Sequence, residues 1–291
     1  MPYPCFWYAR EASAAFRLYA EALAGAEVSV DNGFFCELTL GDSRMAGING
    51  GPRYRPSDAV SVFAELPDAA AVDAAYAALT GGGAEVKMPL GAYDWSERYA
   101  WLTDAWGVSW QLVCVPGAAP ALSPAVMFFG DYAGVGHAAL AHYGEVFAGS
   151  TVAVRMDFPA ESPTNPGQLM HAQLATPGGK VILCDSAPDR DVPLTEGGSL
   201  LVYCDTQAEI DHYWAALTRD GGVPGRRGWL TDRFGVSWQV VPRRLAAWMS
   251  NPATAQHTAT ALQDMTRPIL AELEPPRRSA KPTGLEILRD L

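Results

Sequence analysis

The sequence predicts an α+β fold of two tandem domains, each built from paired βαβββ modules whose curved, mixed or antiparallel sheets surround a cavity. The strongest observation is a copied segment. Residues 101–113 read WLTDAWGVSWQLV and residues 229–241 read WLTDRFGVSWQVV, so most positions are identical at a constant offset of 128. Each copy has two short strand-like runs joined by a turn that contains Asp and Gly, which is typical of a β-hairpin. A copied segment of this length indicates an internal duplication.

Further matches show that whole domains were copied. Residues 19–28 match residues 143–152 at offset 124, residues 38–49 align more weakly with 174–185 at offset 136, and residues 77–80 match 215–218 at offset 138. The order of the matches is the same in both copies. We therefore expect domains at residues 1–117 and 124–243, a linker at 118–123, a helical extension at 244–274 and a flexible tail at 275–291.

The order of elements in the first domain supports two modules. A strand near 4–9 and a helix over 11–24 precede strands near 26–31, 34–40 and 43–49, and a strand over 58–65 and a helix over 68–80 open the second module. The extension is predicted from apolar residues at spacings of three and four. These residues are Leu245, Trp248, Met249, Leu262, Met265 and Ile269. We expect this stripe to pack on a domain or on a second copy of the chain.

The changing offset locates the differences between the copies. The second domain gains twelve residues around 159–167, and the first domain has ten more around 88–98. Because loops on a shared scaffold are where ligands change, these two segments are where we expect the domains to differ in function.

Composition excludes several classes of function. The net charge of -11 argues against nucleic acid as a partner, because phosphate contacts need clustered Lys and Arg. The sequence has no secretion signal and no long apolar run, so we expect a cytoplasmic protein without a membrane partner. The five cysteines are dispersed in apolar runs and are expected to be buried free thiols.

The closing hairpin and the module order resemble those of the vicinal oxygen chelate superfamily. More narrowly, they are similar to the PhnB-like branch of the glyoxalase and bleomycin-resistance group, often labelled demethylubiquinone methyltransferase-like. Residues 49–52 (Asn-Gly-Gly-Pro), 170–174 (Met-His-Ala-Gln-Leu) and 184–186 (Cys-Asp-Ser) also resemble that branch. The resemblance covers about residues 1–245. It implies a pair of sheets, each curved around a cavity that holds a small molecule or a metal.

The resemblance also implies where a metal would bind. Catalytic members of the superfamily hold a divalent metal through residues on the first and last strands of a module. The last-strand position matches Gln111 and Gln239, whereas metal-binding members usually carry Glu. The first-strand neighbourhoods, residues 4–7 and 124–127, contain no His, Glu or Asp. No cofactor is therefore expected, and a transition metal on His171, Asp185 and Gln239 is the alternative.

Candidate catalytic and ligand-binding residues come from both domains. Glu37 and His171 are the candidate acid and base groups. Solvated or capping roles are expected for His137, His142, His212 and His257. The candidate ligand-binding residues are Trp7, Trp95, Arg98, Gln111 and Gln239. Aromatic rings that line a cavity stack on a flat ligand, which a glutamine amide orients by a hydrogen bond.

Two hypotheses of function follow. The first is a metal-independent protein that binds an organic, aromatic small molecule. The second is an enzyme of the superfamily, an isomerase, lyase or dioxygenase, whose metal-dependent or acid/base active site lies in the second domain. A methyltransferase is not expected, because the sequence lacks a glycine-rich cofactor loop after a first strand. The two halves should pack as a pseudo-dimer within a chain that is a monomer or a homodimer.

Overall fold

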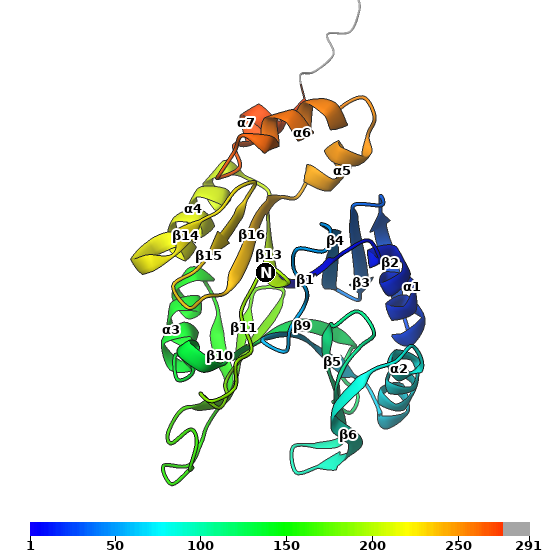
Figure 1. Ribbon diagram of the computed structural model, residues 1–291, viewed down its shortest axis with the longest axis vertical. Helices are drawn as coiled ribbons and strands as arrows, with labels where there is room; N and C mark the ends of the chain where they lie inside the picture. The colour runs from blue at the N-terminus through cyan, green and yellow to red at the C-terminus, as the bar shows by residue number, and fades with distance from the viewer. Residues whose placement is uncertain (276–291) are drawn as a thin grey trace, which may run out of the picture.

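The computed structural model describes residues 1–275, which form four βαβββ modules and a helical extension (Figure 1). The first module comprises β1 (Pro2–Tyr8), α1 (Ala12–Ala22), β2 (Ala26–Asp31), β3 (Phe35–Leu40) and β4 (Ser43–Asn49). The second comprises β5 (Val60–Leu66), α2 (Ala69–Gly81), β6 (Glu85–Tyr93), β7 (Ser96–Thr103) and β8 (Ser109–Cys114). The predicted α+β class and module order are confirmed for the first half of the chain.

The second half repeats this order. The third module comprises β9 (Ala121–Phe128), α3 (Gly136–Val146), β10 (Thr151–Asp157), β11 (Leu169–Thr176) and β12 (Gly179–Asp185). The fourth comprises β13 (Gly198–Cys204), α4 (Gln207–Thr218), β14 (Val223–Pro224), β15 (Trp229–Thr231) and β16 (Ser237–Pro242). The extension consists of α5 (Leu245–Ser250), α6 (Ala255–Gln263) and α7 (Leu270–Leu273). The predicted tail lies, after its first residue, outside the described part of the chain.

Each of the two sheets combines a module of the first half with a module of the second. Sheet A has the strand order β14-β15-β16-β13-β1-β4-β3-β2, and sheet B has the order β10-β11-β12-β9-β5-β8-β7-β6. The contact between halves is antiparallel in both sheets, β1 pairing with β13 and β5 with β9. The two halves therefore form a pseudo-dimer within one chain.

This pairing corrects one expectation. We predicted that each half would enclose its own cavity and that an enzyme site would lie in the second half alone. Each module instead pairs the free edge of its first strand with the first strand of a module from the other half, since an unpaired edge leaves backbone groups unsatisfied. The apolar cavity on sheet A is accordingly lined by residues of both halves.

The copied hairpin joins the two modules of each half through a buried carboxylate. In the first half, Asp104 accepts hydrogen bonds from the Tyr19 hydroxyl of α1 at 2.6 Å and from the Trp110 indole of β8 at 3.0 Å. In the second half, Asp232 accepts the same bonds from Tyr143 and Trp238 at 2.6 and 2.8 Å. Burial raises the pKa of both carboxyls, and these hydrogen bonds oppose that shift. The repeated motif is therefore a structural element.

The helices lie on one face of each sheet. We call the face that packs against α1–α4 the core face and the opposite one the distal face. The apolar residues of both core faces merge into one cluster with the helices, whereas each distal face has a smaller cluster of its own. All five cysteines are buried free thiols, as predicted. Within residues 1–275, every helix is too short or too polar to cross a bilayer.

Candidate ligand-binding site

An apolar cavity of about 290 Å³ lies between the distal face of sheet A and the C-terminal extension. Because β1 and β13 meet at the centre of this sheet, both halves line the cavity. Six strands of sheet A line the cavity, through Trp7, Phe35, Ile48, Leu201, Tyr203, Trp229, Gln239 and Val241. Leu245 and Met249 of α5 and Leu262 of α6 lie on the other side. The apolar stripe predicted in the extension thus packs over the sheet.

The extension is attached on both sides of the cavity. The backbone N–H groups of Arg227 and Gly228 donate to the carbonyls of Met265 and Thr266, both at 2.8 Å. On the other side, the Asn32 amide in the β2–β3 turn donates to the Ser250 hydroxyl at 3.1 Å. The extension therefore spans from the fourth module to the first, as its course in Figure 1 also shows.

The two tryptophans of the cavity have fixed positions. The Trp7 indole N–H donates to the carbonyl of Gly51 at 2.7 Å, and the Trp7 and Trp229 ring centroids are 6.0 Å apart. A Cβ atom on Gly50 would lie 2.0 Å from the Trp7 ring, so only glycine leaves room for that ring. The cavity thus offers preformed aromatic surface, which reduces the entropy lost when a ligand binds.

Gln239 places an amide in the floor of the apolar cavity. Its Nε2 donates to the Ser199 hydroxyl at 2.9 Å, and that hydroxyl donates to the Cys5 carbonyl at 3.1 Å. The side chain is only 4% exposed, and its Oε1 accepts no hydrogen bond from any residue between 1 and 275. A cavity-lining carbonyl with a free lone pair can accept one hydrogen bond from a ligand.

Sheet B carries the equivalent glutamine, with a different neighbour. Gln111 donates to Ser61 at 2.9 Å, but its Oε1 accepts a hydrogen bond from the Tyr99 hydroxyl at 3.1 Å. At the offset of 128 residues, Arg227 occupies the position of Tyr99. In sheet B, therefore, the Tyr99 hydroxyl occupies the amide oxygen of Gln111, whereas the amide oxygen of Gln239 in sheet A accepts no hydrogen bond from the described residues.

A polar hollow of about 410 Å³ adjoins the apolar cavity and shares Tyr203 and Ala246 with it. Glu37 lies in its wall and is 5% exposed. The Tyr203 hydroxyl donates to Glu37 Oε2 at 2.6 Å, and Arg44 pairs with Oε1 at 2.5 Å. Burial and the neighbouring carboxylate raise the pKa of Tyr203. Both carboxylate oxygens of Glu37 thus accept hydrogen bonds from protein side chains. A catalytic role for Glu37 remains a prediction.

Three predicted site residues lie on sheet B instead. His171 and Gln111 are on its distal face, where the Phe63 ring centroid lies 6.0 Å from that of the His171 imidazole. Burial lowers the pKa of His171, so its ring is neutral near pH 7. Trp95 is 60% exposed at the tip of the β6–β7 hairpin and stacks on Tyr93.

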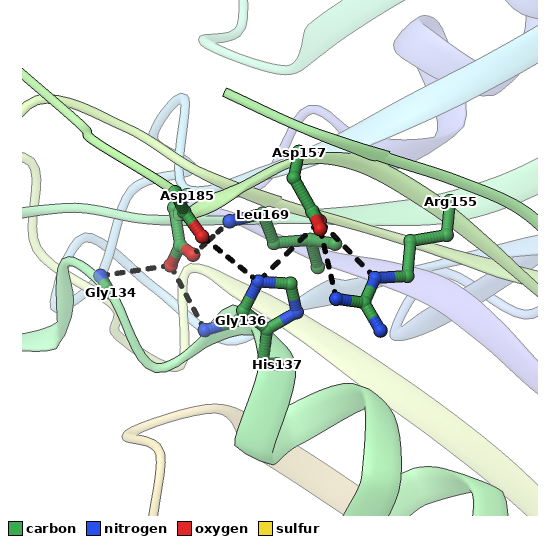
Figure 2. A network of polar contacts seen from close by, with 8 residues as sticks. Gly134, Gly136, His137, Arg155, Asp157, Leu169 and Asp185 are labelled. Carbon is green, nitrogen blue, oxygen red and sulfur yellow. Dashed lines mark hydrogen bonds and ion pairs between the residues drawn. The ribbon is translucent and has the colours of Figure 1, made fainter. Parts of the chain in front are cut away.

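Two further candidates lie on core faces. Asp185 accepts hydrogen bonds from the backbone N–H groups of Gly134, Gly136 and Leu169 at 2.9 to 3.0 Å, as Figure 2 shows. At offset 136 its counterpart Asn49 accepts from the N–H of Ala12, so both side chains anchor the start of a helix. Arg98 pairs with Asp73 of α2.

The alternative metal site is therefore not assembled. His171 lies on the distal face of sheet B, Asp185 on its core face and Gln239 in sheet A. In the described residues, no group of three or more His, Cys, Asp or Glu side chains is placed to hold a metal ion. At the centre of sheet A, burial raises the pKa of the Cys5 thiol to about 12, which leaves only neutral donors beside Gln239. The residues present do not fit a divalent transition metal.

Of the predicted ligand-binding residues, the cavity brings together Trp7 and Gln239. Sequence reasoning did not select Tyr203, Arg227 and Trp229, which also line it. Trp229 is part of the copied hairpin. The difference between Tyr99 and Arg227 at offset 128 is a signal in the sequence that could have pointed to this difference between the two sheets.

The family described as 3-demethylubiquinone-9 3-methyltransferase matches residues 2–113 and 121–241. Glyoxalase I from Zea mays is 13% identical, with 82% of this chain and 91% of that chain covered and a TM-score of 0.55. A protein from Bacillus subtilis provisionally described as a dioxygenase is 10% identical, with 99% and 95% covered and a TM-score of 0.51. The PhnB protein from Bacillus cereus is 22% identical over 38% of this chain and 96% of its own, with a TM-score of 0.35. No protein of curated function matches the chain. The similarity to glyoxalase I and the Bacillus subtilis protein shows a shared fold.

Proposed function

The chain belongs to the 3-demethylubiquinone-9 3-methyltransferase family, the PhnB-like branch of the vicinal oxygen chelate superfamily, and we propose that it binds a small organic molecule without a metal. The observation that carries the proposal is the preformed cavity between sheet A and the extension. Its volume of about 290 Å³ suits a ligand of two or three rings. The Trp7 and Trp229 rings provide stacking surface, and the free Gln239 carbonyl provides one directional contact.

The methyltransferase activity in the family's description is not part of this proposal. A nucleotide-like methyl donor is normally held by a glycine-rich turn between a first strand and its helix. Here the turn between β1 and α1 is Ala9-Arg10-Glu11, which contains no glycine. The lining of the cavity also fits an apolar body better than a charged cofactor, because its sheet residues are mainly aromatic and aliphatic.

Binding of the neutral naphthalene dye prodan tests the proposal. Ala246 of α5 lines the cavity, so an Ala246→Trp side chain would fill it. We expect the intact protein to bind one prodan molecule with a blue-shifted emission, and the A246W variant to lose this signal by at least about tenfold in affinity. A titration followed by prodan fluorescence, with excitation outside the tryptophan band, measures the emission shift and the affinity.

The control is Ala253→Trp, which adds the same side chain at an exposed position between α5 and α6 that does not line the cavity. A253W should bind prodan like the unmodified protein. Absence of saturable binding, or equal binding by A246W and the unmodified protein, would show that the cavity is not the binding site.

A further inference from the structure

Basic residues outnumber acidic residues around the cavity, whereas acidic residues outnumber basic residues in the whole chain. The chain contains 32 acidic and 21 basic residues, with a net charge of -11. The charged residues that line the apolar cavity and the polar hollow are three arginines and one glutamate, namely Arg44, Arg227, Arg243 and Glu37. A locally positive lining in an acidic protein indicates selection for negative charge in the ligand.

Two of the three arginines already have partners. Arg44 pairs with Glu37 at 2.5 Å, and Arg243 pairs with Asp205 at 2.8 Å. Arg227 forms neither an ion pair nor a side-chain hydrogen bond with any residue up to 275. Arg227 is exposed to solvent and also lines the apolar cavity, which places this residue at the rim of the cavity.

The backbone holds Arg227 in an unfavourable conformation at this position. Its φ of 60° lies in the left-handed region, which residues with a Cβ atom rarely adopt. The hydrogen bonds from Arg227 and Gly228 to Met265 and Thr266 maintain that conformation. Residues kept in such conformations cluster at ligand sites, where the surrounding structure fixes the direction of a side chain.

We propose that the natural ligand is a small organic anion, whose flat apolar body lies against Trp7 and Trp229 and whose carboxylate or similar group pairs with the Arg227 guanidinium. This inference rests on the proposed binding function and adds the chemical class of the ligand. A guanidinium forms two parallel hydrogen bonds with a carboxylate, so a neutral amide of the same shape is a poorer partner.

The test compares 2-naphthoate with 2-naphthamide, which have nearly the same shape and differ in charge. Isothermal titration calorimetry at low salt should show naphthoate binding at least about tenfold more tightly than the amide. Arg227→Gln should reduce this preference to less than about threefold, mainly by weakening the binding of naphthoate. Arg227→Lys should retain part of the preference, because it keeps the charge and loses the second hydrogen bond.

Arg226→Gln is the matched control, since Arg226 is the exposed neighbour that does not line the cavity. This variant should keep the full preference for naphthoate. Equal affinities of the intact protein for acid and amide, or an undiminished preference in R227Q, would overturn the inference while the binding function stands. If neither compound binds at millimolar concentration, the proposed function itself is overturned, and the inference with it.

Discussion

His142 is a histidine of α3 that is buried among cations. Its side chain is 2% exposed, and its Nδ1 accepts a hydrogen bond from Arg219 at 3.1 Å. Its Nε2 has no partner among residues 1–275, although Glu145 and Asp220 also lie nearby. Burial, with the charges of Arg233 and Arg219, lowers the pKa of His142 from 6.5 to about 4. The solvated or capping role expected from the sequence is therefore wrong for this residue.

A lowered histidine pKa makes stability depend on pH in one direction. Between pH 6.5 and about 4 the unfolded chain binds a proton that the folded chain does not, so the free energy of unfolding falls as the pH falls. The protonation of this residue lowers the free energy of unfolding by at most about 3 kcal/mol. At offset 124 the equivalent residue is Leu18, so His142→Leu is a natural test. We expect urea unfolding to show a smaller loss between pH 6.5 and 4 in this variant.

His257, an exposed residue of α6, provides the control. His257→Leu makes the same change of side chain and should not reproduce the smaller acid loss expected of His142→Leu. The same acid loss in His142→Leu as in the unmodified protein would mean that other groups cause it.

At the scale of elements, the extension replaces a hairpin. In sheet B, β6 and β7 form a long hairpin whose Tyr99 occupies the acceptor of Gln111. In sheet A the corresponding β14 has only two residues, and residues 265–266 hydrogen-bond beside β15 in its place. The second half therefore lacks ten residues of this hairpin on the same side of sheet A that the extension covers.

Gly228 connects the extension to the sheet and allows a direct test. It has a φ of +87°, and a Cβ atom there would lie 2.6 Å from the carbonyl oxygen of Val240. Gly228→Ala should lower the free energy of unfolding by at least about 2 kcal/mol, because it combines backbone strain with a backbone clash. Hydrogen exchange should also become faster in residues 245–275, where the attachment is weakened.

Gly167→Ala separates the two causes. Gly167 also has a positive φ, of +67°, but no atom lies within 4 Å of its added Cβ. Its substitution should cost only the backbone strain, about 1 kcal/mol, and leave exchange in the extension unchanged. Equal effects of the two substitutions would show that the contact between the added Cβ atom and the Val240 carbonyl does not weaken the attachment of the extension.

The elements were predictable from local patterns, whereas their pairing was not. The copied hairpin, the apolar periodicity and the changing offset predicted all four modules and the helical extension. The pairing of β1 with β13 left no signal, because the first strands of all modules are similarly apolar. The stripe of Leu245 and Met249 predicted packing but did not specify the face, since periodicity describes one helix and says nothing of its partner.

At the scale of the whole molecule, each sheet needs both halves of the chain. The β1–β13 and β5–β9 ladders cross between the halves, while the carboxylates of Asp104 and Asp232 join modules within them. A single half therefore has well-connected modules but two unpaired central strand edges. Such edges expose backbone hydrogen-bonding groups and apolar surface.

Dividing the chain between Gly117 and Ala118 tests this dependence. Fragments 1–117 and 118–291 expressed together should form a one-to-one complex that binds prodan, whereas fragment 1–117 alone should self-associate or remain unfolded. Size-exclusion chromatography with light scattering measures the assembly, and circular dichroism measures folding. A protease site placed after Gly117 in the intact chain is the control, because cleavage of the folded protein should leave the halves together. A monomeric fragment 1–117 that unfolds as cooperatively as the intact protein would show that the halves are independent domains, and that the ladders between them contribute little to stability.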